Sequence, residues 1–363
     1  MAAGNTSIIF PGSASNRIWW RKTSLKPPKR LSPMRILIVK LSALGDVIQT
    51  LPVLKALKSA RPHVEIHWVV EPPAQQILEG HPLLDRLLVF PRRQIIKEKN
   101  WGLLRDFGRS LRAFSYDVVL DLQGLLKSAL VVAAARARLR VGFANHREGS
   151  PFFYNLKLPP YDPDLHAVRR YLLALEVLGV RASAPVFTFP PLPDPKELFS
   201  RYGLQGPVAV FIPRARWESK LWREDGWQEL CRKFEAKGLT PVLVGAKGDL
   251  PYLIRLKANT QAQILAGLRL TELASLLKGA RVIVTVDTGP MHLAAALGKP
   301  VVALFGPTAP WRTGPFGRGH QILGRKSPCS PCFRKVCAEK SCLNRLEAEE
   351  VWEACQKLIN GPV

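Results

Sequence analysis

The sequence has no long uninterrupted apolar run, although 47% of its 363 residues are hydrophobic. The stretch nearest to one, residues 118–139, is interrupted by Asp121, Lys127, Arg136 and Arg138. We therefore predict no membrane-spanning helix. The basic segment of residues 16–30 has no apolar stretch of the kind that a secretory signal needs, which argues against such a signal.

Residues 1–33 carry six Lys/Arg and no acidic residue. Met34 directly precedes the first strand-like run, which suggests that Met34 is the natural start. We expect residues 1–33 to be a disordered basic extension that need not belong to the native protein. A membrane-surface role for its Trp, Lys and Arg side chains is the lesser alternative.

Acidic residues are scarce in the whole chain, where 28 Asp/Glu oppose 53 Lys/Arg and the net charge is +25. Such a basic field attracts nucleic acid, anionic lipid headgroups or a phosphorylated substrate, although it also favours solubility. A GxGxxG turn is missing, because the turn after the first strand holds only Gly45. That absence argues against a nicotinamide-dependent enzyme.

Cysteine is infrequent, and four of the six residues fall in one C-x2-C-x4-C-x4-C cluster: Cys329, Cys332, Cys337 and Cys342. This spacing could hold a structural zinc ion or an iron–sulfur cluster. It could equally form disulfides or stay reduced. The number and placement of cysteines do not indicate a secreted disulfide framework.

Short β-branched runs alternate with amphipathic segments along the chain, which predicts α/β domains with parallel sheets covered on both faces. The predicted strands cover residues 36–39, 66–70, 86–90, 118–120, 139–143, 208–212, 241–245, 281–286 and 300–305. Five prolines in residues 185–195 predict a stiff linker. We therefore expect an N-terminal domain over residues 34–184, a C-terminal domain over residues 196–363, and a cleft between them.

The first candidate site is the turn from Lys40 to Asp46, between the first strand and the first helix. Asp46 would lie at a helix N-terminus beside the cleft, where its carboxylate could take a proton from a hydroxyl group. Helix capping is an equally good explanation for an aspartate at this place.

The second candidate site is the loop of residues 214–222, in which Lys220 could reach a phosphate across the cleft. The third is Asp287-Thr288-Gly289, where a strand turns into a helix whose N-terminus suits an anion. Asp287 would suit ribose or sugar hydroxyls, and His292 lies one turn further on. A charged surface loop and a structural histidine are the alternatives.

The fourth candidate site is a set of cations in first-domain loops that could line an acceptor pocket for phosphates or carboxylates: Lys40, Arg92, Arg93, Lys127 and Arg147. Individually, each of these side chains is more often simply a surface charge.

Three separated motifs recur in order, at residues 34–58, 121–130 and 286–308. With them the sequence resembles the lipopolysaccharide heptosyltransferases, the ADP-heptose-using enzymes of glycosyltransferase family 9. The KLSALGD form of the first motif is most similar to the heptosyltransferase I subfamily. The resemblance implies a GT-B fold of two facing Rossmann-like domains, with the acceptor on the first and the donor on the second.

The implied reaction is an inverting transfer of heptose from ADP-heptose to the Kdo of Kdo-lipid A, without a catalytic metal. Heptosyltransferase II or III, or another sugar-nucleotide transferase, is the alternative. From a different class, a non-catalytic nucleotide-sugar or polyanion binder also fits the charge. We expect a cytoplasmic monomer, peripheral at the inner face of the inner membrane, which binds no nucleic acid.

The resemblance also assigns roles to single residues. Asp46 matches the catalytic aspartate, and Lys220 matches the lysine beside the donor diphosphate. The donor-binding segment is matched by Asp287, Thr288, Gly289 and His292, and Asp249 is matched loosely to a ribose contact. Where relatives carry two threonines before the lysine, this chain has Ala215 and Arg216. The resemblance assigns no role to the cysteine cluster, so a structural zinc ion there is a separate prediction.

Overall fold

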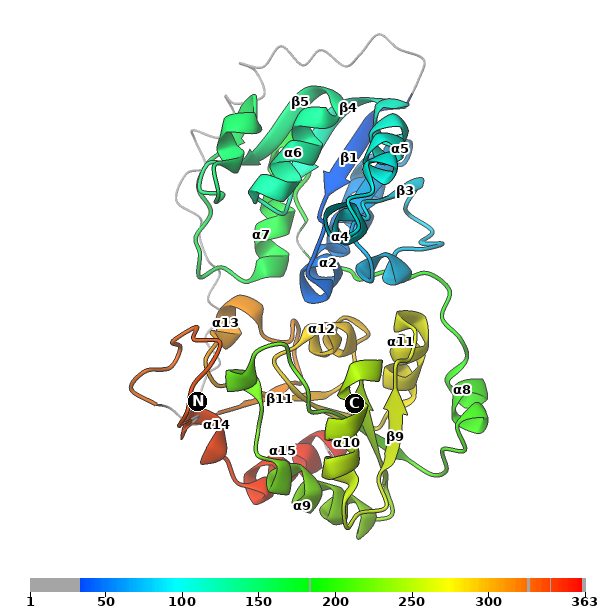
Figure 1. Cartoon of the computed structure of the whole chain (residues 1–363), viewed down its shortest axis with the longest axis vertical. Coiled ribbons are helices and arrows are strands. Elements are labelled where there is room, and N and C mark those ends of the chain that lie inside the picture. Colours follow the sequence, from blue (N-terminus) through cyan, green and yellow to red (C-terminus); the bar gives the residue numbers. More distant parts are fainter. Residues whose placement is uncertain (1–32, 183, 325–326, 340, 361–363) are drawn as a thin grey trace, which may run out of the picture.

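The computed structural model describes residues 33–182, 184–324, 327–339 and 341–360. The expectations for the N-terminal extension thus fall outside the described residues, apart from residue 33. The described chain forms two bodies, each built on a parallel six-stranded sheet (Figure 1). The prediction of two α/β sheets is confirmed.

The first sheet has the strand order β3-β2-β1-β4-β5-β6. Its strands are β1 (Arg35–Val39), β2 (Glu65–Val70), β3 (Arg86–Val89), β4 (Ser115–Asp121), β5 (Arg136–Phe143) and β6 (Leu156–Leu158). The second sheet has the order β12-β11-β10-β7-β8-β9. Its strands are β7 (Val208–Ile212), β8 (Thr240–Gly245), β9 (Gln263–Ala266), β10 (Val282–Val286), β11 (Val301–Leu304) and β12 (Gln321–Leu323).

Both sheets therefore have the same doubly wound strand order. In each sheet the second and third strands are added on one side of the first strand, and the remaining three are added on its other side. Ligands bind outside the carboxyl ends of the strands at such a switch point. The switch point lies between β1 and β4 in the first sheet, and between β7 and β10 in the second. Asp121 ends β4, and the loops after the other three strands carry Lys40, Arg214 and Asp287.

Helices cover both sheets. Those of the first are α2 (Leu44–Thr50), α3 (Pro52–Ala60), α4 (Arg92–Lys97), α5 (Trp101–Arg112), α6 (Leu126–Ala134) and α7 (Ala167–Leu173). Those of the second are α8 (Pro195–Arg201), α9 (Glu224–Glu235), α10 (Leu250–Lys257), α11 (Leu270–Gly279), α12 (Gly289–Ala296), α13 (Pro310–Thr313), α14 (Ser341–Asn344) and α15 (Ala348–Asn360). None of the helices in the described part of the chain is long and apolar enough to cross a membrane.

Several elements differ from the sequence prediction. The prediction of a single helix over residues 47–59 was wrong, because Pro52 begins a new helix, α3, directly after Leu51. Proline has no N–H to donate within a helix and is tolerated only in the first turn. The short strands β6, β9 and β12 carry too few residues for alternation to reveal them. The domain bounds at residues 184 and 196 remain predictions.

The two bodies meet where the first turns of α2 and α12 approach each other. Figure 1 shows these two helices on the facing sides of the two bodies. A side chain at Gly45 would come within 2.4 Å of the His292 ring, and one at Gly289 within 3.1 Å of Leu44. Gln76 reaches across from the first body and accepts a hydrogen bond from the Leu270 N–H at 2.9 Å. The carboxyl ends of both sheets thus border one cleft.

Candidate active site

Asp46 lies in the first turn of α2, and its two carboxylate oxygens have different partners. Oδ2 accepts the Ala43 N–H at 3.1 Å, which is the capping contact that the sequence allowed as an alternative. Oδ1 accepts the Tyr171 hydroxyl at 2.9 Å. The Asp46 side chain keeps 37% of its surface exposed, so the carboxylate is anchored and still open to the cleft.

Lys40 lies buried behind this carboxylate. Its Nζ donates to the Tyr171 hydroxyl at 2.8 Å and to the Leu122 carbonyl at 2.9 Å, and it lies 3.9 Å from Asp46 Oδ1. Burial lowers the pKa of Lys40 to about 8, against the opposing charges of Asp46 and Asp121. Lys40, Tyr171 and Asp46 therefore form one connected network.

The pKa of Asp46 is lowered below its usual value. Burial acts to raise it, but the positive charge of Lys40 and the hydrogen bonds from Tyr171 and Ala43 outweigh burial. His292, which approaches from the second body, acts in the same direction. Asp46 is therefore ionised at neutral pH, which is the state that a proton acceptor needs.

A small polar pocket of about 130 Å³ opens beside Asp46. It is lined by Lys40, Asp46, Leu122, Gln123, Gly124, Phe143, His146, Arg147, Tyr161, Arg170 and Tyr171. Burial lowers the pKa of His146 to about 3, so this ring is neutral. The lining cations favour an anionic group such as a carboxylate or a phosphate.

The other predicted acceptor residues lie outside the lining of this pocket. Lys127 Nζ is 3.3 Å from Glu71 Oε1, and Arg92 Nε donates to the same oxygen at 2.8 Å. Lys127 also donates to the Ser42 hydroxyl at 2.6 Å, beside the Asp46 turn. Arg93 is exposed on α4. The structure thus places Lys40 and Arg147 in the lining of the pocket. Lys127 lies beside the adjacent turn, and Arg92 shares its partner Glu71. Arg93 lies away from the pocket, on the exposed side of α4.

On the opposite side of the cleft, Lys220 pairs with Asp287. Lys220 ends η4 (Glu218–Lys220), and its Nζ lies 2.6 Å from Asp287 Oδ2 and 4.7 Å from the centre of the Trp217 ring. The Thr308 hydroxyl donates to the same Asp287 oxygen at 2.6 Å. Asp287 is only 6% exposed, so its carboxylate positions the ammonium group.

The helix α12 begins directly after these groups. Thr288 precedes its first turn in extended conformation, and Pro290 occupies an early position at which a missing N–H costs nothing. The first N–H groups of a helix have no partner within the helix and attract an anion. The buried His292 lies on the same turn and contacts Gly45 of the first body. Burial lowers its pKa.

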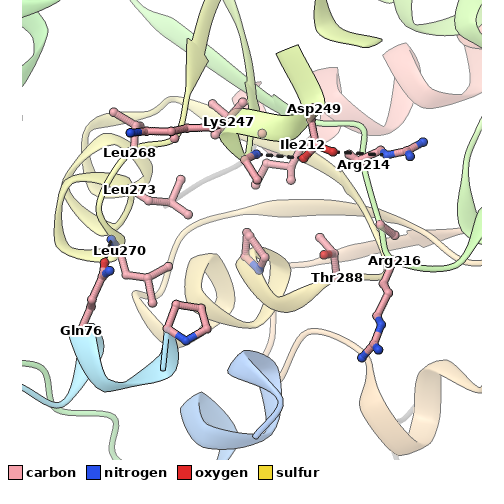
Figure 2. A pocket seen from close by; sticks show the side chains of 17 residues that line it. Gln76, Ile212, Arg214, Arg216, Lys247, Asp249, Leu268, Leu270, Leu273 and Thr288 are labelled. Carbon is pink, nitrogen blue, oxygen red and sulfur yellow. Dashed lines mark hydrogen bonds and ion pairs between the residues drawn. The ribbon is translucent and has the colours of Figure 1, made fainter. Parts of the chain in front are cut away.

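A larger pocket of about 540 Å³ extends from Thr288 into the second body (Figure 2). Its wall includes the apolar side chains Ile212, Val244, Leu268, Leu270 and Leu273 and the polar side chains Gln76, Arg214, Arg216, Lys247 and Asp249. Asp249 accepts the Ala246 N–H at 2.9 Å and lies 3.4 Å from Arg214 Nε. The pocket thus joins apolar walls to a cationic mouth.

Comparison with known proteins places this geometry in a family. The profile of glycosyltransferase family 9 (heptosyltransferase) matches residues 104–343. The chain belongs to glycosyltransferase family 9. It is a glycosyltransferase, and the predictions of family and enzyme class are confirmed.

Individual relatives agree with the family match. The lipopolysaccharide heptosyltransferase 1 of Pseudomonas aeruginosa is 35% identical over 328 residues, which cover 84% of this chain and 87% of the relative. The solved structure of Escherichia coli heptosyltransferase WaaC with ADP is 29% identical, with a TM-score of 0.74 over 90% of this chain and 100% of that one. WaaC with ADP-2-deoxy-2-fluoro heptose is 30% identical, with a TM-score of 0.69 over 88% and 98%. The predicted GT-B fold is confirmed.

In this family 9 enzyme, sequence reasoning missed the residues that surround Asp46 from α7 and from the loop after β5. Tyr171, Arg170 and His146 received no role, because nothing in the local pattern tells which residue of a buried helix faces a site 125 positions away. Thr308, which fixes Asp287, was missed for the same reason. Only the family motif around residues 286–308 could have pointed to Thr308.

The zinc prediction for this glycosyltransferase is not supported. Cys329, Cys332, Cys337 and Cys342 carry free thiols on a surface segment. Across the described ranges, no three His, Cys, Asp or Glu side chains converge on a point that could hold a metal ion. The segment is fastened to the second body instead, because the Ser330 hydroxyl donates to the Gly306 carbonyl at 2.7 Å.

Proposed function

We propose that this enzyme transfers heptose from ADP-heptose to the Kdo of Kdo-lipid A, with inversion at the anomeric carbon. The observation that carries the proposal is the opposition of two half-sites across one cleft. An ionised carboxylate, Asp46, lies on one side, and a lysine beside a helix N-terminus, Lys220 with Thr288, lies on the other. A displacement reaction needs a base for the attacking hydroxyl, which Asp46 would supply. It also needs positive charge beside the leaving group, which Lys220 and the helix N-terminus would supply.

The larger pocket suits the nucleotide part of the donor. Its apolar walls fit a purine base, and Asp249 is placed to accept a ribose hydroxyl beside Arg214. The diphosphate would then lie at the mouth of the pocket, against the N–H groups of Thr288 and Gly289 and within reach of Lys220. The WaaC structures with ADP and with an ADP-heptose analogue support this assignment.

The small pocket suits the acidic sugar of the acceptor. A Kdo carboxylate would meet the cations Arg147 and Arg170 and the neutral His146. This orientation would bring one Kdo hydroxyl to Asp46 Oδ1. Lys127, which donates to Ser42 in the adjacent turn, is close enough in the fold to meet a further phosphate of lipid A.

The proposed step is an in-line displacement. The acceptor hydroxyl oxygen forms a bond to the anomeric carbon, while the bond from that carbon to the diphosphate oxygen breaks. The hydroxyl proton passes to Asp46, and the electron pair leaves with ADP. Lys220 and the α12 N-terminus stabilise the charge that develops on the leaving diphosphate. Contact between the two bodies excludes water, which would otherwise hydrolyse the donor.

We further propose that the enzyme is cytoplasmic and works as a peripheral protein at the inner face of the inner membrane. The acceptor is a phosphorylated lipid, and the chain carries a net charge of +25. Anionic lipids attract basic proteins to that surface. No stable oligomer is needed for the site, since both halves come from one chain.

The test is incubation with ADP-heptose and two acceptors, Kdo-lipid A and Kdo-lipid A that already carries one heptose, with the products read by mass. We expect addition of one heptose to the first acceptor. Addition to the heptosylated acceptor alone would reassign the enzyme to heptosyltransferase II or III. Addition to neither acceptor, with ADP-heptose still bound, would support a non-catalytic nucleotide-sugar binder.

Replacing Tyr171 with phenylalanine is expected to move the acid limb of the kcat/KM profile to higher pH. The Tyr171 hydroxyl lowers the pKa of Asp46 by donating to Oδ1, so its removal raises that pKa and Asp46 is protonated at a higher pH. The ring stays in place over Lys40, 4.2 Å from Nζ. The pH dependence of transfer by wild type and variant is the measurement.

The matched control for Tyr171→Phe is Tyr161→Phe, since Tyr161 lines the same pocket and makes its backbone contacts with Asn145. The control is expected to leave the acid limb unchanged. Equal profiles for wild type and Tyr171→Phe would show that Tyr171 does not tune Asp46.

A further inference from the structure

Exposed apolar side chains concentrate on one side of the first body. Among the described residues, thirteen large hydrophobic side chains are exposed. Six of them belong to α4, α5, α6 and the turn η2 (Ser150–Phe153): Ile96, Trp101, Leu104, Leu126, Leu130 and Phe152. Trp101 is 68% exposed and Phe152 is 88% exposed, so these side chains are available to a partner.

The helix α5 presents this surface because its two sides are occupied differently. Phe107 and Leu111 are buried against the sheet. Trp101 and Arg105 are one turn apart on the outer side of the helix, away from those two residues. Leu104 lies at the edge of the face that holds Phe107 and Leu111, three residues before the first of them, and is still 40% exposed. The edge with Leu104 borders α6, where Leu126 and Leu130 are spaced by one turn and exposed. Figure 1 shows α5 and α6 on the same side of the upper body.

A shallow groove of about 670 Å³ runs between α5 and α6. Its floor is apolar, with Phe90, Phe107, Leu111 and Val131, and Leu104 and Leu130 rise from its sides. Its rim is cationic, with Arg105, Arg109, Arg112 and Arg136. We call the groove, its rim and Trp101 the α5–α6 face.

The charge of the α5–α6 face favours an anionic partner. Residues 92–112 contain seven Lys/Arg and two Asp/Glu. One of those acids, Asp106, is shared between Arg105 and Arg109 at 3.9 and 3.5 Å, with all three side chains largely exposed. Exposed pairs of this kind are weak, so the arginines remain available to bind phosphate groups.

The α5–α6 face adjoins the proposed acceptor pocket. Gly124 lines that pocket, and α6 begins two residues later at Leu126. The Leu126 N–H donates to Glu148 at 3.1 Å, and the Arg147 N–H donates to the Gly124 carbonyl at 3.0 Å. A lipid whose headgroup entered the pocket would therefore have its acyl chains beside the exposed leucines of α6.

We propose that the α5–α6 face seats the enzyme on an anionic lipid bilayer. Trp101, Leu104 and Leu130 enter the interface, and the arginines of the rim contact lipid phosphates, as in an interfacial amphipathic surface. The proposal deepens the proposed function by assigning the membrane contact of the same enzyme. It rests on the exposed apolar side chains of the α5–α6 face, on its cationic rim and on its position beside the proposed acceptor pocket. It does not depend on which sugar is transferred.

The test is co-sedimentation of the full chain, without substrates, with vesicles of phosphatidylcholine alone or mixed with phosphatidylglycerol. Wild type is expected to bind the anionic vesicles, with affinity falling as salt rises. Trp101→Ser with Leu104→Ser should lower the partition coefficient at least about tenfold, since each of the two loses a buried apolar side chain. Arg105→Gln with Arg109→Gln should lower it about 25-fold, at roughly fivefold for each charge.

Two matched control pairs lie on the second body. Leu250→Ser with Ile254→Ser removes exposed apolar side chains spaced by one turn of α10, and Arg232→Gln with Lys237→Gln removes exposed charges at α9. Both pairs are expected to stay within about twofold of wild type. All variants should still transfer heptose to a water-soluble Kdo acceptor, which separates a failed membrane contact from a failed catalytic assignment.

Three results would overturn the proposal. The first is unchanged vesicle binding in both α5–α6 face variants. The second is loss of binding on removal of residues 1–33 alone, which would transfer the contact to the basic extension. The third is a change of molecular mass in solution on mutating the face, without a change in vesicle binding, which would identify the face as a contact between two copies of the chain.

Discussion

Replacing Asp46 with asparagine is expected to lower kcat for heptose transfer by about 10²- to 10⁴-fold, the usual contribution of a general base. The amide oxygen of asparagine can still accept the Ala43 N–H, so the turn should be kept. The amide cannot take the acceptor proton. The measurement is steady-state transfer from ADP-heptose, with donor affinity measured separately by calorimetry.

In this variant, the separate effects on turnover and on donor affinity distinguish a role in catalysis from a role in binding. Donor affinity should change little, because Asp46 belongs to the first body and the proposed nucleotide pocket lies mainly in the second. If turnover stays within about tenfold of wild type, Asp46 is not a general base of ordinary size. Asp46 would then serve only as a helix cap, through the hydrogen bond that its Oδ2 accepts from the Ala43 N–H.

Replacing Lys220 with methionine is expected to lower kcat by about 10²- to 10³-fold, the range for removing a group that stabilises developing charge. The methionine would keep the packing against Trp217 but leave no charge beside the diphosphate. Asp287, with 7% of its side chain exposed, would also lose its cationic partner and keep only the hydrogen bond from Thr308. Breaking a buried ion pair costs up to about 3–5 kcal/mol, and we expect less here because Lys220 is 16% exposed.

The double variant Lys220→Met with Asp287→Asn separates these two effects. It removes the unpaired carboxylate, so the free energy of unfolding should return toward that of wild type. Transfer should remain low, because the positive charge is still absent. If the double variant recovered transfer, Lys220 would act only by neutralising Asp287, and its role at the diphosphate would be wrong.

The repeated doubly wound sheet explains why the fold was predictable from sequence. Buried strands such as β7 and β10 are short runs in which each residue is buried, and these runs recur between amphipathic helices. The strands at the edges of the two sheets were less predictable. β6 and β12 have three residues each, and their pairing is decided by neighbours far along the chain.

The candidate site was predictable where chemistry and local structure coincide. Asp46 and Thr288 both lie where a strand is followed by the start of a helix, which is visible in the sequence. The partners that tune them were not visible. Tyr171 reaches Asp46 over 125 positions and Thr308 reaches Asp287 over 21, and both contacts depend on tertiary structure. The cysteine cluster is the reverse case, since a suggestive spacing did not bring the thiols to one point.

The most direct test of the two-sided site is the configuration at the anomeric carbon of the transferred heptose, read by NMR and compared with that of ADP-heptose. A single displacement, with Asp46 on one side and Lys220 on the other, requires inversion. Inversion in the wild-type product is the result we expect. Retention would require two displacements or attack from the face of the leaving group, and it would contradict direct transfer across the cleft.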